Sequence, residues 1–119
     1  MADYYHLNVY KVSYKLLVAV CHDTKNLNKE HKYTIGEKIK ERAFEILLNI
    51  YRANKNKDKV KFIENALDDT EYIRLSIRLL RDLNVLNESK FANINEIIED
   101  VSTQFLKWGE CSRFRVSIG

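Results

Sequence analysis

The sequence predicts an all-α protein, an antiparallel up-down-up-down four-helix bundle. Its 119 residues include no proline and three glycines, too few turn-forming residues for a β-sandwich or barrel. Apolar residues recur at spacings of three and four along nearly the whole chain, which is the period of an α-helix. Short polar segments separate four such stretches, with the lengths usual between the helices of a bundle.

Length and composition indicate one ordinary globular domain. We expect the bundle to occupy residues 1–109 and a C-terminal tail to follow over 110–119. The chain has no apolar run near the ~20 residues that span a bilayer, no basic and apolar leader at its start, and two cysteines, which cannot form a disulfide framework. These features predict a cytoplasmic protein without a membrane partner.

The first helix is expected from Tyr5 to about Lys25. Its apolar stripe, expected to face the core, contains Tyr10, Tyr14, Leu17, Val18 and Cys21. Two asparagines, Asn26 and Asn28, then interrupt the pattern.

The second helix is expected to start at Thr34. Thr34 and Glu37 have the spacing of a capping box, in which each side chain accepts a hydrogen bond from the backbone amide of the other residue. The apolar face contains Ile35, Ile39, Ala43, Ile46, Leu47 and Ile50. Asn54, a residue that tolerates positive φ, is expected to end this helix.

The third helix is expected over residues 57–83, capped by Asn56 or Asp58. One apolar side contains Ile63, Ala66, Leu67, Ile73, Ile77 and Leu80, and another contains Leu75, Leu79, Leu83 and Leu86. This wide apolar arc predicts contacts with more than one neighbour.

The fourth helix is expected to begin at Asn87 as cap and to end before Gly109. Its apolar stripe contains Phe91, Ile94, Ile97, Ile98, Val101, Phe105 and Trp108. Residues 113–118 then alternate polar with apolar side chains, a strand-like period of two. We interpret them either as a frayed tail or as an arm on a neighbouring subunit.

The sequence offers no pattern typical of catalysis or metal binding. Cys21 and His22 are adjacent, so their side chains point about 100° apart on a helix and cannot share one ion. There is no glycine-framed serine and no glycine-rich phosphate loop. Carboxylate pairs at helical spacing, such as Glu96 and Asp100, are typical of solvated faces. We therefore expect no enzyme activity, no metal and no cofactor.

Basic residues are unevenly distributed. The net charge is +3, yet residues 31–60 alone contain eight Lys or Arg and four Asp or Glu. Lysines mark the turn into the third helix, at positions 55, 57, 59 and 61. Farther along this helix, Arg74, Arg78 and Arg81 fall within about 60° of one another. We call these three residues the arginine ribbon.

Two interpretations of the arginine ribbon are open. Arginine grips phosphates through two parallel hydrogen bonds, which favours a surface that follows a nucleic-acid backbone. The alternative is a salt-bridged face, exposed or between subunits. Glu71 lies three residues before Arg74 and Asp82 four after Arg78, both at pairing distance, and charge runs more often form such faces.

Several motifs resemble a known family. Tyr33-Thr34-Ile35-Gly36-Glu37-Lys38-Ile39 resembles the Tyr-Thr-Leu-Gly-x-x-Ile start of helix two in the accessory variability determinant proteins of diversity-generating retroelements. Further similarities are Ala53-Asn54, Lys59, the leucines of residues 75–80 with the arginine ribbon, Asp82-Leu83, and Leu86 with Phe91. The resemblance covers about residues 8–109 and extends to four-helix-bundle proteins encoded in 23S ribosomal RNA intervening sequences.

The resemblance implies a function. Such proteins form ring-shaped homopentamers that bind RNA and DNA and associate with the retroelement's reverse transcriptase during error-prone copying of a template RNA, without catalytic activity of their own. It implies nucleic-acid contacts at Arg74, Arg78 and Arg81, and less specifically at Lys38 and Lys59. The alternative is a scaffold protein of the intervening-sequence type with no dedicated nucleic-acid role.

Overall fold

The computed structural model describes residue 4 and residues 7–118, with side chains up to residue 110. Its elements are α1 (Asn8–Thr24), α2 (Lys29–His31), the π-helical turn η1 (Lys32–Gly36), α3 (Glu37–Lys55), α4 (Val60–Asp82) and α5 (Glu88–Ile118). Four of these helices are long, and the described part of the chain contains no strand. The predicted all-α, four-helix fold is confirmed.

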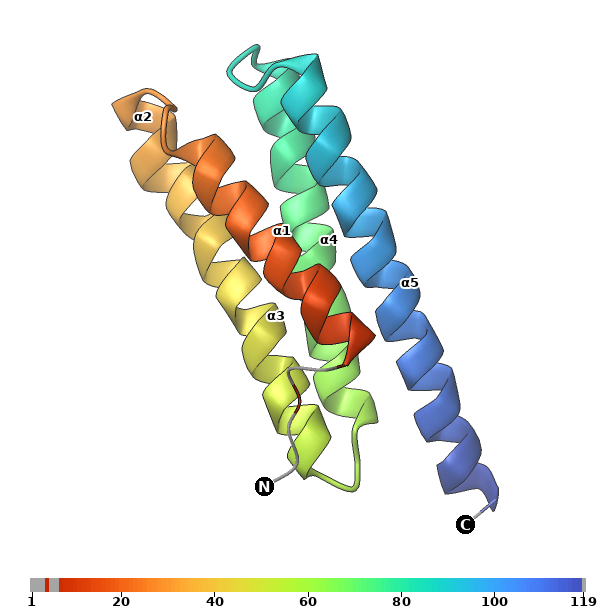
Figure 1. The fold of residues 1–119 in the computed structure, drawn as a ribbon. Helices are drawn as coiled ribbons and strands as arrows, with labels where there is room; N and C mark the ends of the chain where they lie inside the picture. The colour runs from red at the N-terminus through yellow and green to blue at the C-terminus, as the bar shows by residue number, and fades with distance from the viewer. Residues whose placement is uncertain (1–3, 5–6, 119) are drawn as a thin grey trace.

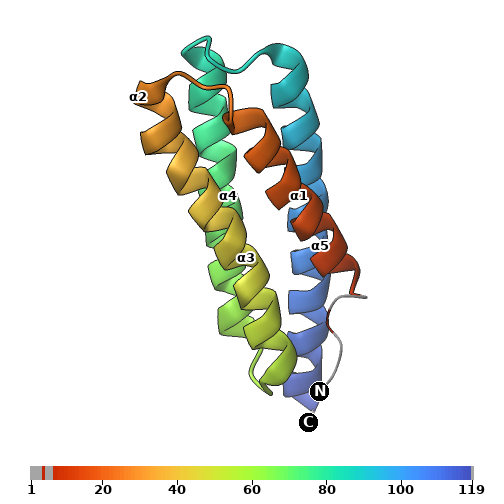
Figure 2. The same cartoon turned by 60° about the vertical axis from the view of Figure 1, so that its left-hand side comes forward.

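The four long helices pack side by side around one core. α1 contacts α3 and α5, and α4 contacts the same two helices, so that each long helix has two neighbours (Figures 1 and 2). Figure 1 shows the chain reversing direction at each connection between long helices. The molecule measures 51 × 24 × 20 Å. Within the described residues, no helix has the length and apolar character needed to cross a membrane.

The core is built almost entirely from aliphatic side chains. The fully buried ones include Leu16, Val20, Ile39, Ile46, Ile50, Ile73, Ile77, Leu80, Ile94, Ile98, Val101 and Phe105. On α3, α4 and α5 these residues are the predicted apolar faces, because apolar and polar residues alternate there with a clear helical period.

The predicted core stripe of α1 is partly wrong. Tyr14 and Val18 are 50% and 52% exposed, whereas Val9, Leu16 and Val20 face the core. The exposed Tyr14 ring stacks on Tyr10, which is partly buried against the core, with ring centroids 6.0 Å apart. Apolar residues occupy most of the circumference of α1, so their spacing alone could not identify the buried side.

The predicted capping box at Thr34 is also wrong. Helical structure begins earlier, because Oδ1 of Asn28 accepts a hydrogen bond from the His31 amide at 3.1 Å. Thr34 lies inside the π-helical turn, where its hydroxyl donates to the Glu30 carbonyl. An N-cap six residues upstream therefore competes successfully with the one predicted.

Of the other predicted helix ends, the one at Asn54 is wrong and the cap at Asn87 is confirmed. Asn54 does not adopt positive φ: α3 ends at Lys55, and in the described part Asn84 (φ 62°) is the single non-glycine residue with positive φ. Asn87 caps α5 as predicted, accepting from the Lys90 amide at 2.8 Å. Asp58 accepts from the Val60 amide at 3.3 Å, at the start of α4.

The predicted end of the last helix at Gly109 is wrong. α5 continues to Ile118, and Gly109 lies buried inside it. A β-carbon at Gly109 would lie 3.4 Å from Cγ2 of Ile63, an ordinary van der Waals contact with α4. Residues 113–118 are helical in backbone rather than strand-like; their side chains lie outside those described.

The second apolar row of α4 does not reach the core. Leu75, Leu79 and Leu83 are 67%, 46% and 48% exposed, while Leu86, beyond the helix, is buried. We call the three exposed residues the leucine row. Within the described chain, only the side of α4 that contains Ile73 and Ile77 packs against other helices, and the side that contains the leucine row does not.

Candidate nucleic-acid interface

Arg74 lies in the seam between α4 and α5. Its guanidinium forms ion pairs with Glu71 on its own helix and with Glu99 of α5, the latter at 3.0 Å. It also donates to the Ser102 hydroxyl at 3.0 Å. The side chain is 28% exposed. Arg74 therefore links the two helices, and the predicted pairing with Glu71 is confirmed.

Arg81 is also held by neighbouring side chains. Its Nε donates to the Asp82 carboxylate at 3.2 Å. Its guanidinium lies 4.2 Å from the centroid of the Phe91 ring, a cation–π contact with α5. Asp82 was expected to pair with Arg78 and instead pairs with Arg81.

Arg78 is the exposed member of the arginine ribbon. No ion pair of Arg78 occurs among the described residues. It borders a shallow apolar cleft between the π-helical turn and α4, which Ile35, Leu75 and Leu79 also line. The structure thus places the three arginines on one side of α4, with Arg78 alone presenting an unpaired guanidinium to solvent.

The two predicted lysines lie outside α4, the helix that carries the arginine ribbon. Lys38 is exposed on α3 and forms a long ion pair with Glu41, at 3.7 Å. Lys59 donates from Nζ to the carbonyls of Ala53 and Asn56, at 2.7 and 2.8 Å, and so caps the end of α3. At 1.5 Å per residue, Lys59 and Arg81 are about 33 Å apart along α4. The five predicted residues therefore do not form one cluster.

Other lysines of the α3–α4 connection were not predicted as site residues. Lys55, Lys57 and Lys61 are exposed. The sequence already displayed them as a run of alternating lysines, but only the structure separates the lysine that caps a helix from those that face solvent.

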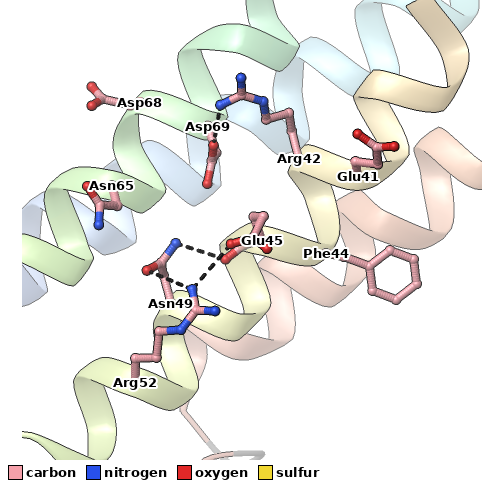
Figure 3. A pocket seen from close by; sticks show the side chains of 9 residues that line it. All are labelled: Glu41, Arg42, Phe44, Glu45, Asn49, Arg52, Asn65, Asp68 and Asp69. Atoms are coloured by element: carbon pink, nitrogen blue, oxygen red, sulfur yellow. Dashed lines mark hydrogen bonds and ion pairs between the residues drawn. The ribbon is translucent and has the colours of Figure 1, made fainter. Parts of the chain in front are cut away.

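The groove between α3 and α4 has a different character (Figure 3). Four carboxylates and two guanidiniums line it, which gives a net charge of −2. Arg42 pairs with Asp69 at 2.9 Å, and Arg52 pairs with Glu45 at 3.2 Å. None of the lining residues is a histidine, a cysteine or a hydroxyl-bearing nucleophile. The groove would repel phosphate, and its residues do not form a pattern typical of catalysis.

Burial raises the pKa of the Asp69 carboxyl above its ordinary value, and the hydrogen bond and charge of Arg42 only partly oppose this effect. Nearby Glu45 and Asp68 raise the pKa of Asp69 further through like charge. The hydrogen bond to Asp69 in turn raises the pKa of Arg42, which stays charged. This pair links α3 to α4 and has the geometry of a structural contact.

Among the described residues, no group of three His, Cys, Asp or Glu side chains is placed to hold a metal ion.

Comparison with known protein families matches residues 9–110 to the bAvd-like family. This range covers 102 of the 119 residues; it includes α3 and α4 entirely and most of α1 and α5. No curated protein sequence matches the chain. The helical bundle agrees with the resemblance to accessory variability determinant proteins seen in the sequence. The chain therefore belongs to the bAvd-like family of Avd-type accessory proteins.

Proposed function

We propose that this protein is a non-enzymatic accessory factor of a diversity-generating retroelement. In this proposal it binds RNA and DNA and associates with the element's reverse transcriptase while a template RNA is copied. The observation that carries the proposal is the family match over residues 9–110. The uneven placement of positive charge on the bundle supports it.

The proposed phosphate contacts are the arginine ribbon, with Lys38 and Lys59 as weaker contributors. Arg78 is exposed and can meet a phosphate directly. The carboxylates that hold Arg74 and Arg81 are 60–61% exposed, and ion pairs at such positions contribute little. A phosphate oxygen can therefore replace a carboxylate oxygen on these two guanidiniums at small cost.

We propose that the protein assembles into a ring of identical copies, five in the form that the family resemblance implies. The leucine row supports this proposal, because neighbouring exposed leucines on one helix favour a protein contact. A ring would also repeat the arginine ribbon around one axis, so the field at a bound strand would exceed that of a single chain with net charge +3.

Binding of labelled single-stranded RNA, measured by fluorescence anisotropy over a range of salt concentrations, tests the proposal. Arg78→Gln should weaken binding, and the triple variant R74Q/R78Q/R81Q should weaken it much further. Circular dichroism would verify that both variants stay helical. Unchanged affinity in a folded triple variant would refute the site, and absence of RNA binding by the wild type would refute the nucleic-acid role.

The alternative is a scaffold protein of the intervening-sequence type. It is favoured by one observation: two of the three ribbon arginines already have carboxylate partners within the chain. This function predicts no retention of RNA, or retention that does not depend on salt.

A further inference from the structure

We propose a second phosphate-binding site at the end of the bundle where α3 meets α4. Its residues are Lys55, Lys57 and Lys61, which we call the lysine tip. Its ligand would be the backbone of single-stranded RNA or DNA. The inference rests on the proposed function, and it assigns to that function a surface distant from the arginine ribbon.

Positive charge is concentrated in the segment of the chain that forms this connection. The segment 51–62 contains five basic residues and one acid, Asp58, for a net charge of +4. The whole chain carries +3, so the remaining residues together carry −1. A polyanion approaching the bundle is therefore drawn toward this end.

Backbone hydrogen bonds divide the charged residues of the connection into two groups. Lys59 donates to two carbonyls at the end of α3, at 2.7 and 2.8 Å. Asp58, the one acid in the segment, accepts from the Val60 amide at the start of α4. These two residues shape the connection. Lys55, Lys57 and Lys61 remain exposed around it.

The lysines of the tip have no carboxylate partner among the described residues, unlike the cations that are held in ion pairs on the bundle. Arg42, Arg52, Arg74 and Arg81 each form an ion pair with Asp or Glu, as do Lys38 and Lys40. Within the described residues, no ion pair involves a lysine of the tip. A phosphate at the tip thus meets cations without displacing a carboxylate.

Aromatic rings lie beneath two of these lysines. Nζ of Lys55 is 4.6 Å from the centroid of the Tyr51 ring, and Nζ of Lys61 is 4.9 Å from that of Phe62. These cation–π contacts hold the ammonium groups near rings that are partly buried. Lysines beside aromatic rings are the combination with which proteins bind single strands, because phosphates meet the charges and bases stack on the rings.

The test compares two triple variants with the same loss of charge. K55Q/K57Q/K61Q removes the lysine tip. K11Q/K15Q/K25Q removes three exposed lysines at α1, none of which forms an ion pair with a described residue. Affinities for labelled oligouridine and oligothymidine are measured across a salt series. The tip variant should lose about tenfold or more in affinity, and its slope of log K against log salt should fall by about 2; the control should stay near wild type.

The outcomes separate the inference from the function on which it rests. Equal losses in the two triple variants, or none in the tip variant, would refute the lysine tip while wild-type binding leaves the proposed function standing. Loss with oligouridine alone or with oligothymidine alone would make the tip selective for RNA or DNA and still support it. If wild type binds neither strand, both proposals fail.

A single substitution guards against a folding defect in the triple variant. Lys57 lies in the connection, outside both helices, so Lys57→Glu should leave helicity intact. It should weaken binding of both strands by severalfold through the reversed charge. Unchanged affinity of this variant would also contradict the inference.

Discussion

Replacing Arg74 by Gln should destabilise the bundle, whereas the same replacement of Arg78 should not. The two arginines are neighbours on α4 and lose the same charge. Arg74 is bound to Glu71, Glu99 and Ser102, two of which belong to α5. No ion pair holds Arg78 within the described residues. The pair of variants therefore separates a structural contact from a surface charge.

The expected magnitude follows from the exposure of the partners. A hydrogen bond to a charged group contributes about 1.5–3 kcal/mol, but exposed ion pairs contribute about 0.2–1 kcal/mol. Because Glu71 and Glu99 are each 60% exposed, we expect Arg74→Gln to cost about 1 kcal/mol in total. For a domain of this size that lowers Tm by about 3–5 °C. Arg78→Gln should stay within about 0.5 kcal/mol of the wild type.

Urea unfolding followed by circular dichroism, at equal protein concentrations, measures both values. Equal m-values would show that the variants differ in stability rather than in compactness. The reasoning would be refuted if Arg74→Gln were as stable as the wild type, or if Arg78→Gln lost as much stability as Arg74→Gln.

Four further substitutions test other parts of the structure. Because burial raises the pKa of Asp69, its protonated form is favoured on folding, and this contribution disappears as pH rises through the raised pKa. The unfolding free energy of Asp69→Asn relative to wild type should thus increase from acid to neutral pH in a urea series; a decrease would contradict the assignment. Gly109→Ala should stabilise the bundle by about 0.5–1 kcal/mol, because alanine favours a helix over glycine. The added methyl group would meet Ile63 at 3.4 Å, an ordinary contact. A lowered Tm in thermal unfolding would contradict this prediction. Ile73→Ala should lower the free energy of unfolding by about 2–5 kcal/mol, measured by chemical unfolding. Leu75→Asp should keep its helicity and lower the molar mass of the assembly found by light scattering. An unchanged mass would count against the leucine row as a subunit contact.

The sequence predicted the helical faces best where apolar and polar residues are sharply separated. On α3, α4 and α5 the residues of one stripe are buried, as the helical period requires. On α1, tyrosine and valine lie outside as well as inside, and the period could not show that Tyr14 faces solvent. The true inward side depends on which neighbours pack there, which is a property of the assembled bundle.

Helix ends were harder to predict than helices. Thr34 and Glu37 have the spacing of a capping box, but Asn28 caps the helical stretch six residues earlier. Gly109 resembles a helix terminator, yet it is accommodated inside α5 beside Ile63. In both cases a local signal lost to a competing contact.

The sequence could predict which face of α4 the candidate arginines share, but it could not predict which side chains pair with them. Helical spacing correctly placed the arginine ribbon on one side of α4. The partners of Arg74 on α5, Glu99 and Ser102, are 25 and 28 residues away in the sequence, and only the packing of two helices brings them together. The same limit applies to Lys59, whose role as a cap depends on the path of the connection.

The most direct test of the central claim is complementary-DNA synthesis from template RNA by the reverse transcriptase of the same retroelement. The account predicts that the enzyme with this protein forms a stable complex on the RNA and makes much more product than the enzyme alone. It also predicts that the protein by itself makes none. Equal synthesis with and without the protein, together with no complex on size-exclusion chromatography, would contradict the proposed accessory role.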